Sequence, residues 1–267
     1  MRLIIFSDLD GTLLNHDDYS LDAARPVLDR ISQARIPLIL TTSKTRHEVE
    51  QIRDIMAICD PFIVENGGGI YFPLGYRGFK IGRGEEKKGY TLVQLGLPYE
   101  QIRCFFISVQ HRFGAKGFGD LPLHSIMELT GLPPDRAALA NIREFTEPFL
   151  MDRDEDISAL TQLAGEKGMK ITCGGRFHHL MGIDQDKGKA VRTVCEIFYQ
   201  NLGRDFITVG VGDSENDLPM LQQVDIPVLV PRPVKGYLDI QLPRLIRAVN
   251  PGGRGWNEVV GELLDEL

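Results

Sequence analysis

Short apolar runs alternate along the first part of the chain with segments in which apolar residues recur at helical spacing. The runs lie at residues 3–6, 38–40 and 62–64, and the helical spacing lies at residues 21–34 and 49–56. Such alternation favours an α/β fold with a parallel sheet and helices on both of its faces. Ser20 is the expected N-cap of the first helix. Ligands in such sheets bind beyond the carboxyl ends of the strands.

The pattern changes after about residue 82 and returns near residue 186. Residues 78–89 are rich in glycine and charge and predict a hinge or loop. The segment that follows mixes two patterns, with helices expected at 99–109, 123–129 and 135–140 and strands at 147–151, 169–173 and 177–181. Beyond it we expect a helix at 190–198 and strands at 206–211 and 226–230. The sequence therefore predicts a Rossmann-like α/β core, residues 1–82 and 186–267, split by a smaller α+β cap domain, residues 83–185.

Composition narrows the class of protein. The chain has 267 residues, of which 43% are hydrophobic and 25% charged, as in an ordinary globular protein. Its formal net charge of −7 argues against a nucleic-acid or membrane partner, because such partners select basic surfaces. The cysteines form no CxxC pair, so neither a zinc site nor a redox motif is expected. No apolar stretch has the length of a signal peptide or a membrane span, and we expect a soluble, cytoplasmic protein.

The first chemical signal is the string Asp8-Leu9-Asp10-Gly11-Thr12, directly after an apolar run. An isolated Asp-Gly pair would indicate only a turn. Two carboxylates at the end of a buried strand indicate more, because an unpaired buried charge is very costly. A hard cation such as Mg²⁺ would neutralise them through oxygen ligands.

Further polar groups follow the other expected strands. Asp213 ends the run at 206–211 and Asp217 lies near the start of the next helix, where both could instead act as helix caps. Thr42 or Ser43 can donate a hydrogen bond to a phosphate oxygen or cap the helix that follows. Lys187, before a helix, can pair with the carboxylates and a phosphate, although such lysines are also common on solvated surfaces.

In their order along the chain, the four pieces resemble the haloacid-dehalogenase-like phosphatase superfamily over roughly residues 1–82 and 186–267. That order is Asp-x-Asp-Gly-Thr, then Thr42 or Ser43, then Lys187, then Asp213 with Asp217. The resemblance implies a phosphatase with Mg²⁺ as cofactor. Asp8 would be the nucleophile that forms an aspartyl-phosphate, and Asp10 the general acid and base. Thr42 would bind the phosphate, with Ser43 as its alternative, and Lys187 would brace Asp8 and the phosphate. The implied metal ligands are Asp8, Asp10 through its backbone carbonyl, Asp213 and Asp217, the last of which ligates the metal or orients its neighbours.

The insert resembles the larger cap of the Cof-like branch of that superfamily. Its strings are similar to the mannosyl-3-phosphoglycerate phosphatase family: Ser43-Lys44-Thr45-Arg46, Glu65-Asn66-Gly67-Gly68-Gly69-Ile70-Tyr71, Arg143-Glu144-Phe145 and Gly174-Gly175-Arg176-Phe177-His178-His179. The substrate implied is a glycosyl phosphoglycerate, mannosyl-3-phosphoglycerate, which would be converted to mannosylglycerate. The residues expected to bind it are Ser43, Lys44, Glu65, Asn66, Gly67, Gly68, Arg143, Glu144, Gly175, Arg176, His178 and Asn216.

The types of these residues fit such a substrate, although each also has a purely structural role open to it. The glycine run can offer backbone N–H groups to an anion or only build a turn. Arg176 can form a bidentate pair with a carboxylate. Glu144 and Asn66 can bond sugar hydroxyls. His178 and His179 are neighbours on an expected strand and face opposite sides, so at most one of them faces a ligand.

Three alternatives stay open at this point. The same core with a different cap would act on glucosyl-3-phosphoglycerate, sucrose phosphate or another sugar phosphate. A phosphomutase also uses an aspartyl-phosphate but excludes water. A non-catalytic binding module would need no general acid at Asp10, which argues against that class. The expected partner is therefore a small phosphorylated metabolite, and the protein is expected to be a monomer or a homodimer.

Overall fold

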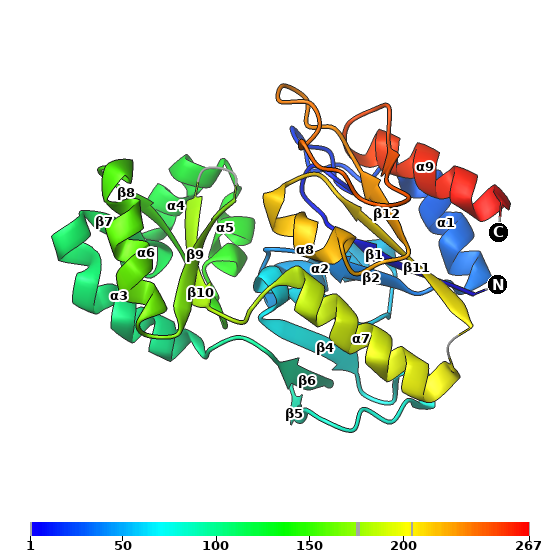
Figure 1. Cartoon of the computed structure of the whole chain (residues 1–267), viewed down its shortest axis with the longest axis horizontal. Helices are drawn as coiled ribbons and strands as arrows, with labels where there is room; N and C mark the ends of the chain where they lie inside the picture. The colour runs from blue at the N-terminus through cyan, green and yellow to red at the C-terminus, as the bar shows by residue number, and fades with distance from the viewer. Residues whose placement is uncertain (1, 175–176, 204, 267) are drawn as a thin grey trace.

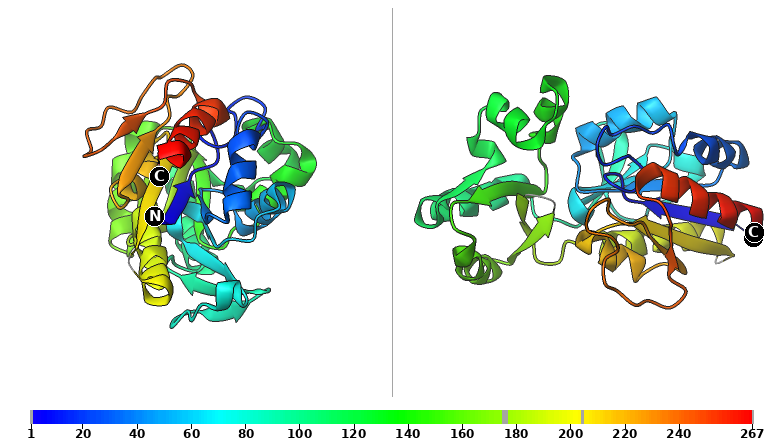
Figure 2. Two further views of the ribbon diagram at one scale, coloured as in Figure 1. Left: turned by 90° about the vertical axis from the view of Figure 1, so that its right-hand side faces the viewer. Right: turned by 90° about the horizontal axis from the view of Figure 1, so that it is seen from above.

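The chain folds around two β-sheets in a computed structural model that describes residues 2–174, 177–203 and 205–266 (Figure 1). Within these residues the larger sheet has nine strands in the order β13-β12-β11-β1-β2-β3-β4-β6-β5. The smaller sheet has four, in the order β7-β8-β10-β9. Viewed from above, the smaller sheet with its helices lies at one end of the larger one (Figure 2).

The larger sheet is mostly parallel. Its strands are β1 (Arg2–Ser7), β2 (Leu38–Thr41), β3 (Phe62–Val64), β4 (Gly69–Pro73), β5 (Glu85–Lys87), β6 (Tyr90–Gln94), β11 (Phe206–Gly212), β12 (Ile226–Leu229) and β13 (Ile246–Arg247). The strands from β13 to β3 are parallel, and β4, β6 and β5 continue the sheet in antiparallel fashion. Because β1 pairs with β11 on one side and β2 on the other, the carboxyl ends of these strands lie side by side.

Helices cover both faces of this sheet. One face carries α1 (Arg25–Ala34), α2 (Arg46–Met56) and α9 (Gly252–Glu266), and the other carries α7 (Lys187–Leu202) and α8 (Leu218–Leu221). Leu3 and Ile5 of β1 pack into the first layer, whereas Ile4 and Phe6 pack into the second. A strand buried on both faces is an unbroken apolar run, as the sequence shows. The predicted α/β architecture is confirmed.

The insert has its own antiparallel sheet and its own apolar clusters. Its strands are β7 (Ala115–Gly117), β8 (Thr146–Met151), β9 (Met169–Gly174) and β10 (Phe177–Gly182). One face packs against α3 (Tyr99–Phe113) and α6 (Ile157–Gly165), and α4 (Leu123–Thr130) and α5 (Pro134–Ala140) pack around Phe118 beside Phe177. No helix in the described ranges has both the length and the apolar character needed to cross a membrane.

Two local predictions were wrong. The first helix begins at Arg25 with Ala24 as N-cap, because a proline in its first turn sets the start; the Ser20 hydroxyl instead accepts from the Asp22 N–H at 3.0 Å. Residues 78–89, expected as a hinge or loop, include β5. Lys88 (φ 50°) and Gly89 (φ 86°) form a tight left-handed turn that pairs β5 with β6. The chain therefore leaves the larger sheet after Gln94, and the division at residue 83 stays a prediction.

Candidate active site

Four charged side chains meet where β1 and β11 end. Asp8 follows β1 directly, and its N–H donates to the Val211 carbonyl at 2.9 Å. The Lys187 ammonium is fully buried and lies 2.7 Å from Asp8 Oδ1 and 2.6 Å from Asp217 Oδ1. Asp8, Asp213 and Asp217 each offer an oxygen atom, and these atoms all lie within 4.8 Å of one another. The structure thus joins residues that are about 180 to 210 positions apart in the chain.

The first turn of α7 places Lys187 in this cluster. Asp186 is its N-cap and accepts from the Lys189 N–H at 2.7 Å, which fixes where the helix begins. Gly188 lies against the backbone carbonyl of Pro219 so closely that a Cβ would overlap it. The absence of a side chain at this position lets α7 approach α8 and brings Lys187 to Asp217.

The cluster holds more negative than positive charge. Burial raises the pKa of Asp8 well above its usual value, the Asp217 carboxylate raises it further, and Lys187 opposes both. Burial and Asp217 raise the pKa of Asp213 to about 7. Burial disfavours the Lys187 ammonium, but Asp217 and Asp8 together raise its pKa. Three carboxylates facing one ammonium make a donor set that suits a hard divalent cation.

Asp217 fixes the positions of its neighbours. Its Oδ1 accepts from Lys187, and its Oδ2 accepts from the backbone N–H groups of Asp213 at 3.0 Å and Ser214 at 3.1 Å. Both oxygens are therefore engaged with the protein, which favours an orienting role for Asp217.

Asp10 lies at the edge of the cluster and contacts Lys44. Its side chain is 41% exposed, and its Oδ2 lies 2.8 Å from the Lys44 ammonium, which is only 12% exposed. Asp10 Oδ1 is buried and accepts no hydrogen bond from a described residue. Lys44 was expected to bind substrate, and its pairing with Asp10 was not predicted, because nothing in the spacing of the two residues indicates it.

Thr42 and Ser43 follow β2 beside this cluster. Thr42 is fully buried, and its Oγ1 accepts from the Lys44 N–H at 3.2 Å, which leaves the hydroxyl proton free to donate. Ser43 is partly exposed, and its carbonyl accepts from Arg143 Nη1 at 2.9 Å. Arg143 therefore brings the insert to the second strand end of the predicted site.

The turn after β3 holds the insert through Glu65. This carboxylate is fully buried and accepts hydrogen bonds from the Glu144 N–H at 2.8 Å, the Phe145 N–H at 3.0 Å and the Thr146 hydroxyl at 2.6 Å. Both carboxylate oxygens of Glu65 therefore accept hydrogen bonds from residues at or just before the start of β8. Glu65, expected as a substrate ligand, contacts the insert instead of an open surface.

The two segments that connect the larger sheet to the insert bind the same turn. The Leu95 and Gly96 N–H groups both donate to the Gly68 carbonyl at 2.9 Å, and Gln185 Nε2 donates to the Glu65 carbonyl at 2.6 Å. We name residues 65–68, with these contacts, the junction turn. Gln185 was not predicted, because its position two residues before Lys187 gives no signal of its own.

Glycine and left-handed backbone make the junction turn possible. Glu65, Asn66 and Gly67 have φ values of 48°, 56° and 88°. A Cβ on Gly67 would overlap the Asp186 carbonyl, and one on Gly68 would overlap Phe145. The Gly68 N–H bonds the carbonyls of Val64 and Glu65. These glycines therefore serve close packing, and the Gly68 N–H is not available to an anion.

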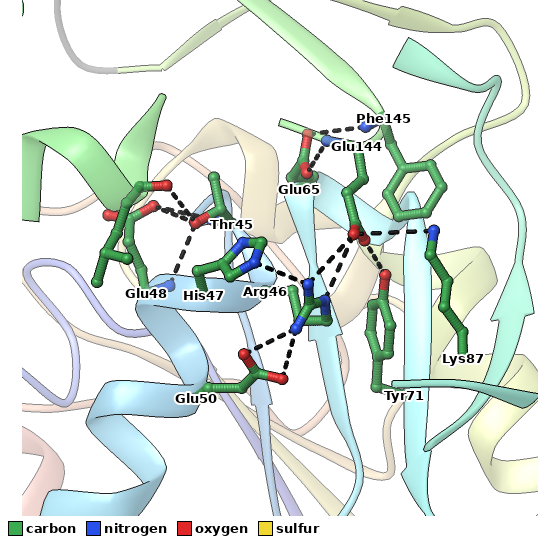
Figure 3. Close-up of polar contacts among 11 residues, drawn as sticks. Thr45, Arg46, His47, Glu48, Glu50, Glu65, Tyr71, Lys87, Glu144 and Phe145 are labelled. Carbon is green, nitrogen blue, oxygen red and sulfur yellow. Dashed lines mark hydrogen bonds and ion pairs between the residues drawn. The ribbon is translucent and has the colours of Figure 1, made fainter. Parts of the chain in front are cut away.

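Glu144, expected to bond a sugar hydroxyl, belongs to a polar cluster behind the junction turn (Figure 3). Its carboxylate accepts from the Tyr71 hydroxyl and lies 3.4 Å from Arg46 Nε and 3.7 Å from the Lys87 ammonium. Arg46 also binds Glu50 through two hydrogen bonds of 2.6 and 2.8 Å. The cluster joins α2, β4 and β5 to the insert.

The remaining expected ligands are distributed more widely. Asn216 Nδ2 donates to Asn66 Oδ1 at 3.1 Å, which ties the acidic loop to the junction turn. His178 pairs with Phe149 across β10 and β8, and the two rings lie 5.4 Å apart, on the face that packs against α3 and α6. Gly175 and Arg176 lie outside the described residues.

Comparison with known proteins identifies the family. A model of the haloacid dehalogenase-like hydrolases matches residues 5–76 and 141–232. A glucosyl-3-phosphoglycerate/mannosyl-3-phosphoglycerate phosphatase of Persephonella marina is 50% identical over 99% of this chain and 98% of its own length. A mannosyl-3-phosphoglycerate phosphatase of Pyrococcus horikoshii is 36% identical over 84% of this chain and 89% of its own length.

Solved structures share the fold at low sequence identity. A Thermoplasma acidophilum protein superposes with a TM-score of 0.71 at 18% identity, over 99% of this chain and 98% of that one. The sucrose-phosphatase of Synechocystis superposes with a TM-score of 0.60 at 16% identity, over 98% of each chain. With this fold, this match and these relatives, the chain belongs to the haloacid dehalogenase-like hydrolase family and is a phosphatase within it.

Proposed function

We propose that the protein is a Mg²⁺-dependent phosphatase that acts through Asp8 on a glycosyl-3-phosphoglycerate, releasing phosphate and the glycosylglycerate. The observation that carries the proposal is the buried group of Lys187, Asp8, Asp213 and Asp217 at the ends of β1 and β11. A binding protein has no use for a nucleophile braced by a buried lysine. The names of the relatives supply the class of substrate.

The chain's own residues account for the two steps of such a reaction. Asp8 attacks the phosphorus atom, the ester bond breaks, and Asp10 gives its proton to the leaving oxygen. Asp10 then takes a proton from water, which attacks the phosphorus and breaks the bond to Asp8. Lys187 holds Asp8 in place and offsets charge on the phosphoryl oxygens, and the Thr42 hydroxyl donates to one of them.

The donor set fits a metal ion next to this group. Asp8 and Asp213 provide buried carboxylate oxygens, with Asp217 behind them as the orienting group and the Asp10 carbonyl as a further donor. Mg²⁺ bound there would neutralise charge on the transferring phosphoryl group.

Phosphate release from a small panel of substrates tests the proposal. The panel contains mannosyl- and glucosyl-3-phosphoglycerate, 3-phosphoglycerate, mannose and glucose phosphates and sucrose phosphate, each with Mg²⁺. We expect kcat/KM for a glycosyl-3-phosphoglycerate to exceed that for the sugar phosphates by at least about 10²-fold, the effect of roughly 3 kcal/mol of selective contacts. Equal values across the panel would contradict the substrate assignment, and an absence of phosphate release would contradict the activity.

The metal-free protein is expected to lose stability as pH rises from about 4 to 7. The pKa of Asp213 in the folded protein is about 7, above its usual 3.8, so the folded state keeps a proton that the unfolded chain has already lost between these values. Below pH 4 both states are protonated and the stabilisation is complete; above pH 7 it is gone. Thermal unfolding in a chelator across this range measures the effect.

Mg²⁺ should reverse that loss. At a concentration near 100 times its dissociation constant, Mg²⁺ adds about 2.7 kcal/mol, or an increase of about 5 °C in the unfolding temperature at pH 8. Asp213→Asn is the matched control, since it removes both a titrating group and a metal ligand and should weaken both responses. An unchanged unfolding temperature of the wild-type protein on adding Mg²⁺ would argue against a metal site in this cluster.

A further inference from the structure

A cavity of about 240 Å³ lies between the core and the insert, next to Lys44. Its core wall comes from the segment between Leu14 and Arg25 and from α2, and its other wall comes from Leu132 and Arg136 of the insert. The cavity is thus complete only when the insert lies over the core. Asp8, Asp10, Thr42 and Lys187, which carry the proposed reaction, do not line it.

The lining is basic, although the whole chain carries a net charge of −7. Arg25, Lys44 and Arg136 stand against two carboxylates, Asp22 and Glu48, which leaves an excess of one positive charge. Glu48 is already engaged, because its Oε2 accepts from the Thr45 N–H at 2.9 Å and from the Thr45 hydroxyl (Figure 3).

Two of these cations are available to a ligand. Within the part of the chain that the structure describes, the side chains of Arg25 and Arg136 form neither a hydrogen bond nor an ion pair, and both are partly exposed. Lys44 forms an ion pair with Asp10 Oδ2 at 2.8 Å, whereas Glu48 Oε1 lies 3.8 Å from the ammonium, beyond hydrogen-bond distance. An ammonium has three N–H donors, so Lys44 too retains donors for an anion.

The position of Lys44 relative to the chemistry selects the anion. In the proposed reaction Asp10 protonates the ester oxygen of the substrate, and Lys44 contacts Asp10. In a glycosyl-3-phosphoglycerate the carboxylate is separated from that oxygen by only two carbon atoms. A substrate whose phosphate contacts Asp8 therefore has its carboxylate within reach of a cation adjacent to Asp10.

We propose that this cavity is the subsite for the glycerate carboxylate, with Lys44 of the core and Arg136 of the insert as the cations that bind it. The inference rests on the proposed function and deepens it. A carboxylate held in this way connects the two parts of the protein, so substrates that lack it lose a contact with each part. Selection for phosphoglycerate derivatives over plain sugar phosphates follows.

The test compares 3-phosphoglycerate with glycerol 3-phosphate, which differ only in a carboxylate against a hydroxymethyl group. We expect the wild-type enzyme to favour 3-phosphoglycerate in kcat/KM by about tenfold or more, the usual effect of hydrogen bonds to a charged group. Lys44→Met and Arg136→Met should bring this ratio close to one. If the substitution of Lys44 disturbs Asp10, kcat/KM falls by the same factor for both substrates, and the ratio of the two values does not change.

Two further variants, together with Arg136→Met, keep the test decisive. Arg112→Met, on the exposed side of α3, removes a cation of the insert away from the cavity and should keep the wild-type ratio. Lys44→Arg keeps the charge and should retain most of the preference. Arg136 forms no hydrogen bond or ion pair with Asp10, so Arg136→Met decides the matter if Lys44→Met is inactive toward both substrates.

A wild-type ratio near one, or an unchanged ratio in Lys44→Met and Arg136→Met, would overturn the proposed subsite. So would a loss of the preference in Arg176→Met alone, because the carboxylate would then bind elsewhere. These outcomes differ from a failure of the proposed function, in which the wild-type enzyme releases no more phosphate from glycosyl-3-phosphoglycerates than from sugar phosphates.

Discussion

Asp8→Asn is expected to abolish phosphate release and to leave the protein folded. The amide has nearly the shape of the carboxylate but cannot attack phosphorus, so kcat should fall by about four to six orders of magnitude, as for other enzymes that lose a nucleophile. The substitution also removes one of three clustered carboxylates. Burial and Asp217 raise the pKa of Asp8 well above its usual value, so its ionised form is costly in the metal-free protein. The unfolding temperature of metal-free Asp8→Asn at pH 8 should therefore equal or exceed that of the wild type.

Asp29→Asn is the control for this variant, because it removes the same charge from an exposed position on α1. Phosphate release and thermal unfolding are measured on both purified proteins. Activity of Asp8→Asn within tenfold of the wild type would exclude Asp8 as the nucleophile. An unfolded Asp8→Asn protein would show instead that the carboxylate is needed for the fold.

Lys187→Met should remove activity and, unlike Asp8→Asn, destabilise the protein strongly. The ammonium is fully buried and bonds both Asp8 and Asp217. Without it these carboxylates lie in the interior with no cation, and breaking a buried ion pair from one side costs about 3–5 kcal/mol. We expect the free energy of unfolding of the metal-free protein to fall by that amount in urea titrations.

The matched control is Lys189→Met in the same turn of α7, where the side chain is only half-buried. It should keep both activity and stability. Added Mg²⁺ should restore part of the stability of Lys187→Met, since a bound cation replaces some of the lost positive charge. A stability of Lys187→Met equal to that of Lys189→Met would contradict the electrostatic role assigned to Lys187.

The sequence predicted that Asp8, Thr42 and Asp213 follow strands of one sheet, because each of them has a local signature. β1, β2 and β11 are rich in apolar residues, and Asp8, Thr42 and Asp213 directly follow them. Parallel pairing then brings the strand ends together without further information. Lys187 could be placed with them only through the resemblance, since its string alone is common on surfaces.

The sequence predicted the surroundings of the site less well because they depend on contacts between distant segments. Glu65 and Glu144 are polar residues next to the expected site, and polarity alone does not distinguish a substrate ligand from a residue that binds the insert. The hairpin of β5 and β6 was not predicted, because its turn, Lys88-Gly89, lies in a charged, glycine-rich stretch that is also typical of a loop. The pairing of Lys44 with Asp10 requires the fold to be known.

The junction turn has a mechanical consequence for how the protein can select its substrate. Every segment that connects the two lobes bonds to residues 65–68, so sliding one lobe along the other would break the bonds to Glu65 and Gly68 together. A rotation centred on the turn would displace these bonds least, because they lie at its axis. The turn therefore acts as a fulcrum: a small angular change there becomes a large displacement at the far end of the insert, whereas Asp8 and Lys187, next to the fulcrum, hardly move.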